Sequence, residues 1–281
     1  MARHVRLREL LVGIEGLALL RNLYDGKDAD ADDRIAEIRW LLDDRAFDAG
    51  ELTSEADARS GYGAWSGRYD EPGNPVIGLE QPVMWSLLGS SAPGRALDAA
   101  CGTGRHARRL AELGHTVTGV DIAPEMLDRA RVAVPSATFL EGDLRSIPAS
   151  NGEFDLVVCG LALAHVAELD AAAAELARVL AAGGRLLVSV LHPFQAILGW
   201  HAPFEDDKGR RWFVREHPHT HADYLDAFAA AGLALRRCVE PKLTAAEVPA
   251  KRRAFRHLPE ATSAAYVGLP AVLIWDAEKP A

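Results

Sequence analysis

The chain has 281 residues, 49% of them hydrophobic, which is enough apolar material for one substantial core and a smaller attachment. Its 40 acidic residues outnumber its 31 basic ones, and the net charge of -9 repels phosphate backbones and anionic lipid headgroups. Three cysteines without CxxC spacing predict neither a disulfide framework nor a zinc knuckle. These features disfavour nucleic acid and membrane as partners. They favour a cytoplasmic globular protein without a signal peptide.

The first 58 residues have the apolar spacing of helices. Apolar residues recur at helical intervals from Leu7 to Ala18 and again from Ile35 to Leu42. We interpret the acidic stretch between them, residues 28–33, as a solvated loop that supplies helix-capping oxygens rather than as a metal site. Composition shifts to Gly, Tyr, Trp and Pro after residue 60. The pattern predicts an N-terminal helical lid segment, residues 1–58, ahead of a second unit that covers residues 59–281.

From residue 95 onward, short apolar runs alternate with segments of helical length. The strand candidates are residues 95–100, 116–121, 137–143, 154–160, 185–191, 234–239 and 271–276. This alternation predicts an α/β fold, a doubly wound and mostly parallel seven-stranded sheet with helices on both faces. Longer segments at about residues 193–220 and 241–270 interrupt the rhythm, and we expect them to be late insertions. Ligands of such sheets bind beyond the carboxyl ends of the strands.

The first strand of this series runs into a glycine-bearing turn, LDAACGTG at residues 97–104. Two glycines there permit a tight turn and a close approach of the backbone to a ligand. The spacing of Gly102, Gly104 and Ala107 also matches the loose dinucleotide fingerprint, so a nicotinamide or flavin enzyme is one reading. Asp98 counts against that reading, because a carboxylate at the strand end disfavours a pyrophosphate and suits a cationic ligand.

Four motifs in order resemble those of the class I S-adenosylmethionine (SAM)-dependent methyltransferases, specifically the small-molecule type 11-like group. They are LDAACGTG at 97–104, VTGVDIAPEML at 117–127, EGDL at 141–144 and FDLVVCG at 154–160. The resemblance covers about residues 61–241, with Ala100 standing where the family has its first loop glycine. It implies SAM as the cofactor.

The resemblance also implies which residues hold the cofactor. Asp121 would accept the ribose hydroxyls and Asp143 the adenine amino group. An aromatic stretch before the glycine loop is similar to a segment that folds over the cofactor in many such enzymes, where Arg68 would clamp the methionine carboxylate and Tyr69 would line the methyl pocket. A packed linker is the alternative for that stretch. The expected cofactor contacts are Arg68, Tyr69, Asp98, Ala100, Gly102, Gly104, Asp121, Ile122, Met126, Asp143, Leu144 and Gly160.

Methyl transfer from a sulfonium is an in-line displacement, so the protein must align the acceptor, exclude water and, where needed, remove a proton. Histidine is the natural base. His192, directly after the fifth strand, is the first catalytic candidate, with a strand cap as its structural alternative. His165, after the fourth strand, is the second, with packing at the cofactor edge as its alternative. The expected acceptor-binding residues are Tyr24, Tyr62, Trp65, His217, Trp200 and Phe204. Of these, Tyr24, Trp200 and Phe204 equally suit a role in fixing the insertion to the sheet.

We expect no metal. The three histidines that alternate over residues 217–221 share one face of an extended chain and could chelate an ion. However, Pro218 and the helix that follows indicate a loop in which one of these histidines, or Thr220, caps the helix. The acidic residues 205–207 are typical of a solvated turn.

Together these patterns favour a methyltransferase that acts on an oxygen, a nitrogen or an electron-rich aromatic carbon of a small molecule. No motif specifies the acceptor atom. The chain lacks the Asn/Asp-Pro-Pro-aromatic motif and the Pro-Cys nucleophile of DNA-modifying enzymes, and its basic runs, such as residues 251–253, are short. A nucleic-acid or protein methyltransferase, a non-catalytic SAM-binding protein and a nicotinamide oxidoreductase stay open as alternatives. Monomer and homodimer are equally open.

Overall fold

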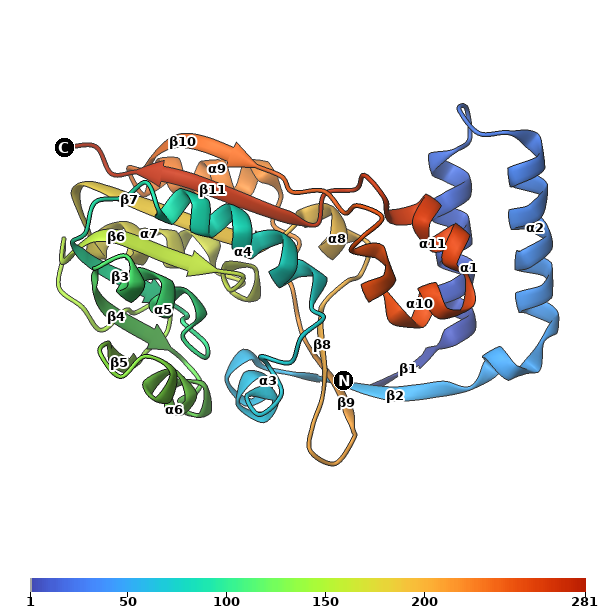
Figure 1. Cartoon of the computed structure of the whole chain (residues 1–281), viewed down its shortest axis with the longest axis horizontal. Coiled ribbons are helices and arrows are strands. Elements are labelled where there is room, and N and C mark those ends of the chain that lie inside the picture. Colours follow the sequence, from blue (N-terminus) through green and yellow to red (C-terminus); the bar gives the residue numbers. More distant parts are fainter. Residues whose placement is uncertain (1) are drawn as a thin grey trace.

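The computed structural model describes residues 2–281 and contains two sheets (Figure 1). The larger has the strand order β10-β11-β7-β6-β3-β4-β5. Its parallel strands are β3 (Arg95–Ala99), β4 (Thr116–Asp121), β5 (Thr138–Glu141), β6 (Phe154–Gly160) and β7 (Leu180–Leu191). β11 (Val272–Glu278) pairs antiparallel with β7 and with β10 (Ala234–Val239). The predicted seven-stranded, mostly parallel sheet is confirmed.

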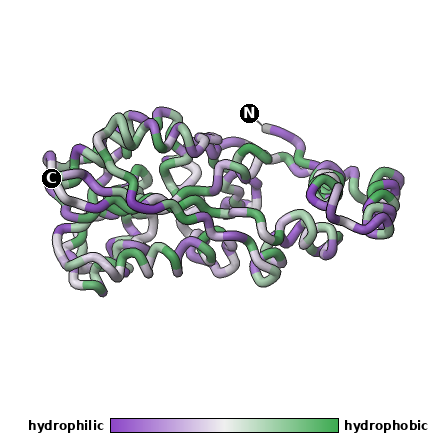
Figure 2. The backbone as a smooth tube through the Cα atoms, turned by 90° about the horizontal axis from the view of Figure 1, so that it is seen from above, coloured by the Kyte–Doolittle hydropathy of each residue, from purple (hydrophilic) through white to green (hydrophobic). Residues whose placement is uncertain are grey.

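Helices cover both faces of this sheet, because strand side chains alternate between two apolar clusters. Ala96 and Val158 face one cluster together with helices α4 (Pro75–Leu88), α5 (Arg105–Glu112) and α6 (Pro124–Ala133). Leu97 and Val157 face the other, together with α7 (Leu169–Val179) and α9 (His221–Ala230). Figure 2 shows apolar chain segments running through the middle of this part of the molecule. No helix within residues 2–281 is long and apolar enough to cross a membrane.

The smaller sheet joins the N-terminal segment to the first insertion. Its order is β1-β2-β9-β8, from β1 (Ala2–Arg6), β2 (Gly50–Ala56), β9 (Arg211–Val214) and β8 (Ala202–Glu205). The expectation of helices throughout residues 1–58 is therefore wrong for β1 and β2. β2 pairs with β9, which is remote in sequence, so the local spacing of apolar residues could not predict this sheet.

A helical group stands at the end of the larger sheet toward which β6 and β10 point (Figure 1). It consists of α1 (Leu7–Arg21), α2 (Asp28–Asp43), η1 (Arg45–Asp48), η3 (Val248–Ala250), α10 (Arg252–His257) and α11 (Pro259–Tyr266). Leu11 and Ile14 of α1 pack in one buried cluster with Ala261 and Ala265 of α11. The N-terminal helices thus pack on the second insertion.

The acidic stretch at residues 28–33 is not the loop that the sequence suggested. It forms the first turns of α2, where the positive end of the helix dipole favours carboxylates. The remaining short elements are α3 (Ala58–Trp65), η2 (Leu163–His165) and α8 (Pro193–Ile197). The division of the chain into a lid, residues 1–58, and a domain, residues 59–281, stays a prediction.

Candidate functional site

A cavity of about 420 Å³ opens at the carboxyl ends of β3, β4, β5 and β6. The strand ends and the segments that follow them contribute Ala100, Gly102, Asp121, Ile122, Met126, Gly142, Asp143, Leu144, Arg145, Gly160, Leu161, Ala162, His165, Val166, Ala167 and Glu168. Asp57, Ala58, Arg59, Tyr62, Tyr69 and His217 complete the wall from α3, its flanks and the first insertion. Because parallel strands end along one edge, the cavity lies where ligands of this fold class bind.

The glycine loop after β3 presents its backbone to this cavity. Ala100, Gly102 and Gly104 have φ values of 57°, 53° and 88°, all in the left-handed region. Glycine adopts that region freely, whereas alanine pays roughly 1–2 kcal/mol. The Cys101 N–H donates to the carbonyl of Val120 at 2.9 Å and joins the loop to β4. Gly104 begins α5 and does not line the cavity.

Asp121 stands at the end of β4 and lines the cavity. One carboxylate oxygen accepts the N–H of Gly102 at 2.8 Å, and the other accepts that of Ala123 at 2.9 Å. Burial raises the pKa of this carboxyl in spite of the two hydrogen bonds. Since a carboxylate has about four acceptor positions, each oxygen keeps capacity for another donor. The loop therefore holds a rigid acceptor pair at the cavity wall.

Asp143, after β5, also lines the cavity, but Arg145 already engages its carboxylate. The guanidinium Nη2 lies 2.7 Å from Oδ2, and Nε lies 3.0 Å from Oδ1. The hydrogen bond from Arg145 lowers the pKa of this carboxyl, which is therefore ionised. The adenine contact expected for Asp143 would share that carboxylate with Arg145.

Asp98 lies behind the glycine loop, outside the residues that line the cavity. Its side chain is 1% exposed, and Oδ2 accepts the N–H of Ala107 at 2.7 Å. Burial raises the pKa of this carboxyl to about 6. This bond anchors the first turn of α5, whose amides have no partner within the helix, and the contact expected between Asp98 and the cofactor stays a prediction.

Arg68 is also outside the cavity lining, and the carboxylate clamp expected of it stays a prediction. Its guanidinium pairs on the surface with Glu71, at 3.1 and 3.3 Å. The two residues are one helical turn apart in sequence, so the pair forms locally without a ligand. Apart from Gly104, the other expected cofactor residues, Tyr69, Ile122, Met126, Leu144 and Gly160 among them, line the cavity, and their contacts with a cofactor stay predictions.

A buried ionic network that the sequence analysis missed supports the glycine loop from behind. Glu80 of α4 is 0% exposed and contacts Arg105 Nη1 at 2.6 Å, His106 Nε2 at 2.9 Å and Ser189 Oγ at 2.8 Å. Burial alone would raise the pKa of Glu80, but His106 and Arg105 outweigh it and hold the pKa at about 2. Because Arg105 and His106 open α5, this network fixes the helix that follows the loop.

Tyr62 and His165, which both line the cavity, form a hydrogen-bonded pair. The Tyr62 hydroxyl lies 2.6 Å from His165 Nε2, and His165 Nδ1 lies 2.7 Å from the carbonyl oxygen of Arg215. A carbonyl only accepts, so Nδ1 carries the proton and Nε2 of the neutral ring accepts from Tyr62. Glu216, a buried carboxyl whose pKa is raised by that burial, lies 3.5 Å from Nε2.

The expected acceptor-binding aromatics fall into three groups. Tyr62 and His217 line the cavity. Trp65 stacks on Phe204 with ring centroids 5.6 Å apart, and this contact joins α3 to the smaller sheet outside the cavity lining. Trp200 packs against Tyr266 of α11, and Tyr24 is 93% exposed beyond the end of α1. Neither of the last two lines the cavity, and the acceptor contacts expected of them stay predictions.

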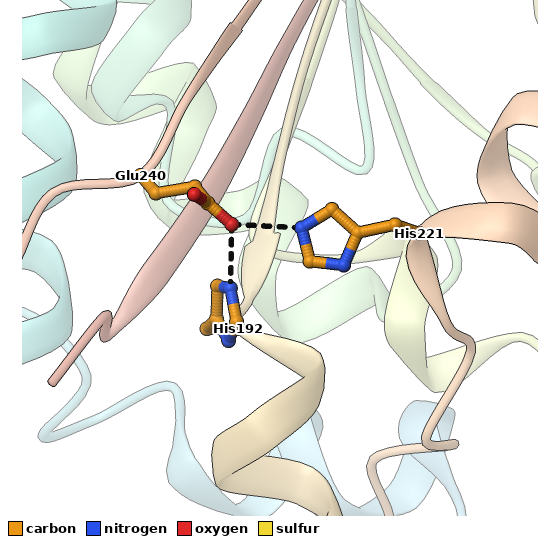
Figure 3. A group of neighbouring side chains, drawn as sticks. All are labelled: His192, His221 and Glu240. Atoms are coloured by element: carbon orange, nitrogen blue, oxygen red, sulfur yellow. Dashed lines mark hydrogen bonds and ion pairs between the residues drawn. The ribbon is translucent and has the colours of Figure 1, made fainter.

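His192, the first candidate base, does not line the cavity either. Its Nδ1 accepts the N–H of Phe194 at 3.1 Å and caps α8, and its Nε2 lies 3.0 Å from Glu240 (Figure 3). The chain turns into α8 directly after β7 and carries this side chain toward β10. Its structural alternative, a cap at the strand end, describes these contacts.

The alternating histidines also separate. His217 and His219 stack with ring centroids 5.8 Å apart, whereas His221 turns to Glu240 at 2.8 Å. Thr220 caps α9 and makes a capping box with Asp223, as one of the two readings of this loop predicted.

Residues 97–188 match the family model described as "Methyltransferase domain". Malonyl-[acyl-carrier protein] O-methyltransferase of Serratia marcescens is 36% identical over 146 residues, which is 51% of this chain and 56% of that protein. Demethylmenaquinone methyltransferase of Beutenbergia cavernae is 32% identical over 144 residues, 48% of this chain and 60% of that protein. The chain thus spans about half the length of the curated relatives it matches.

Solved structures share the fold. A SAM-dependent methyltransferase from Mesorhizobium loti superposes with a TM-score of 0.55 at 24% identity, over 72% of this chain and 99% of that one. The [4+2]-cyclase SpnF superposes with a TM-score of 0.59 at 18% identity, over 81% of this chain and 98% of that one. Residues 97–188 therefore carry a methyltransferase domain, and the chain has the fold of the solved SAM-dependent methyltransferase.

Proposed function

We propose that the protein transfers the methyl group of SAM to a hydroxyl-bearing small molecule. The observation that carries the proposal is one cavity lined by two groups: Asp121 with the glycine loop, the proposed nucleotide end, and the Tyr62–His165 pair, the proposed acceptor end. Its volume of about 420 Å³ is within the usual range of small-molecule sites. The relatives named above are methyltransferases, which supports the same reaction class.

The residues at the first end fit the cofactor. Asp121 has free acceptor capacity for two ribose hydroxyls, Leu144 and Ile122 offer apolar surface to a purine, and the left-handed loop lets backbone approach closely. When bound, SAM supplies an electrophilic methyl group on a sulfonium. Tyr69 and Gly160 would then lie between the cofactor and the acceptor end, where they restrict water.

At the acceptor end, Tyr62 and His165 are suited to remove a proton. The methyl–sulfur bond would break, with its electron pair left on sulfur, as the acceptor oxygen bonds the methyl carbon. The acceptor's proton would pass to the oxygen of Tyr62, and the Tyr62 proton to Nε2 of His165. The resulting imidazolium keeps its Nδ1–H bond to Arg215 and gains the nearby Glu216. We therefore assign the base role to His165 rather than His192, because only His165 of the two lines the cavity.

Fold alone does not decide the reaction, as the cyclase SpnF on the same architecture illustrates. The test is calorimetric titration of the protein with SAM and, separately, with NAD, followed by methyl transfer from labelled SAM to panels of phenols, amines, nucleic acids and proteins. SAM binding with label in the hydroxyl panel supports the proposal. NAD binding without SAM binding, label in a macromolecule, or SAM binding without transfer to any panel contradicts it.

A further inference from the structure

Three metal-ligating side chains gather outside the cavity (Figure 3). His192 follows β7, His221 is the first residue of α9 and Glu240 follows β10. Within residues 2–281 this is the one group of three or more His, Cys, Asp or Glu residues whose ligand atoms all lie within 4.8 Å of one another. None of the three lines the cavity.

We propose that these residues bind one divalent transition-metal ion, best matched by Zn²⁺. Two imidazole nitrogens and one carboxylate oxygen are the ligands that Zn²⁺ prefers, and three protein ligands leave a fourth position for water. Bonds of the usual length place tetrahedral ligands roughly 3.3 Å apart. Glu240 Oε1 lies 3.0 Å from Nε2 of His192 and 2.8 Å from Nε2 of His221, so the cluster opens only slightly to admit an ion.

Both histidines carry a proton on the Nε2 atom that would bind the ion, so these protons must leave first. His192 Nδ1 accepts the N–H of Phe194, so its proton sits on Nε2, which donates to Glu240. His221 Nε2 also donates, because the carboxylate can only accept. On binding, each imidazole gives up its Nε2 proton and takes another at Nδ1. At His192 this costs the hydrogen bond to Phe194, a small loss beside two nitrogen–metal bonds.

The position of the cluster indicates what the ion does. His192 precedes the first insertion, residues 193–220, and His221 closes it, while Glu240 precedes the second insertion, residues 241–270. One ion bound to these three residues would therefore crosslink the two boundaries of the first insertion to the start of the second, at the ends of β7 and β10. The second insertion carries α10 and α11, on which the N-terminal helices pack, so the tie also steadies that group.

The experiment uses the full chain, stripped with EDTA and titrated with ZnCl₂ while metal content, heat and thermal melting are followed. We expect one Zn²⁺ per chain, a higher melting temperature with zinc, and a visible tetrahedral spectrum when Co²⁺ replaces it. Glu240→Gln and His221→Ala should each weaken zinc affinity by more than about 100-fold, since loss of outer-shell partners alone costs 10- to 100-fold. Both side chains are partly exposed, so both variants should fold. His4→Ala, at an exposed histidine of β1, is the matched control and should bind zinc normally.

Absence of zinc uptake by the stripped protein overturns the proposal. So does uptake that both cluster variants retain, or uptake that His4→Ala loses. Melting of each variant without zinc separates loss of a ligand from loss of the fold. Calorimetry with SAM on the same preparations distinguishes this proposal from the proposed function, because zinc binding and SAM binding use different residues.

Discussion

The two ends of the cavity are built in different ways. At the end proposed to hold the nucleotide, Ala100, Gly102, Asp121 and Asp143 come from three consecutive strand ends. At the acceptor end, Tyr62 comes from α3, His165 from η2, and the carbonyl that orients His165 from Arg215 after β9. The residues of the first end therefore lie in short sequence motifs, whereas those of the second are brought together only when segments remote in sequence pack against one another.

At both ends, nevertheless, backbone groups determine whether a side-chain atom donates or accepts a hydrogen bond. Two amide N–H groups keep Asp121 as an acceptor, and one carbonyl keeps the proton of His165 on Nδ1. Backbone groups do not titrate, so these roles are less easily changed than roles set by ionisable neighbours. Substitutions at each end should consequently separate binding from turnover.

The largest effect is expected at the acceptor end. Tyr62→Phe and His165→Gln should each lower kcat by about 10²–10⁴-fold, the contribution typical of a positioned base. SAM affinity should stay within about threefold, because the nucleotide end is untouched. Steady-state kinetics with the acceptor found in the panels, with calorimetry on the same variants, measures both. Exposed His257 provides the control, and His257→Ala should turn over normally. Equal loss of affinity and turnover would mean that the two ends are not separable.

Breaking the network behind the glycine loop should reduce stability most. Glu80→Ala leaves Arg105 and His106 without their buried carboxylate, and loss of one partner of such a group costs about 3–5 kcal/mol in the free energy of unfolding. Urea denaturation measures this loss in the free energy of unfolding.

The stability that Glu80 contributes should also depend on pH. The pKa of Glu80 is about 2 against 4.5 for the free side chain, so this contribution is complete above pH 4.5 and is lost as pH falls toward 2. A variant with the wild-type acid profile would contradict this account. Glu71→Ala, at a surface pair, is the control and should change stability by less than about 1 kcal/mol.

At the nucleotide end, Asp121→Ala should weaken SAM binding by about 1–3 kcal/mol, because donors of the loop and the cofactor lose their acceptor. Asp121→Asn keeps the shape and should lose less. Calorimetric titration with SAM compares the two. Unchanged affinity in the alanine variant would remove Asp121 from the site and leave the nucleotide end without its central contact.

These differences explain which parts of the molecule could be predicted from sequence. The seven strands, the glycine loop and Asp121 follow from patterns of a few residues, and the model places them as expected. β1 and β2 could not be found, because their sheet is completed by β9 from the first insertion. Tyr62 and His165 were both singled out, but nothing local pairs them.

Glu80 did leave a signal in the sequence. It is the one charged residue of the largely apolar segment 75–88, and such a carboxylate needs a buried partner. His192 shows a related limit: its position at the strand end was predicted, but the turn into α8 decides where the ring points. Sequence position thus locates a residue along the sheet edge without specifying its direction.

The smallest effect concerns Ala100. Its φ of 57° lies in the left-handed region, so Ala100→Gly should relieve strain and raise the free energy of unfolding by up to about 1 kcal/mol, after the entropy that glycine loses on folding. Thermal denaturation with and without SAM measures the change. The same substitution at Ala99, whose backbone is extended within β3, is the control and should destabilise the protein. A less stable Ala100→Gly protein would show that the loop needs the methyl group for packing.

The smaller sheet has a consequence for the order in which the molecule folds. β2 pairs in parallel with β9, with Thr53 opposite Arg211, so the strand must wait for a partner made much later in synthesis. Contacts between such distant residues form slowly, because a long loop must close first. The Arg215 guanidinium then pairs with the Glu55 carboxylate of β2 through two N–O contacts of 2.6 Å. We expect this sheet to be the last unit to assemble and the first to open in hydrogen exchange, so that the orientation of His165 by Arg215 arises late and is lost early.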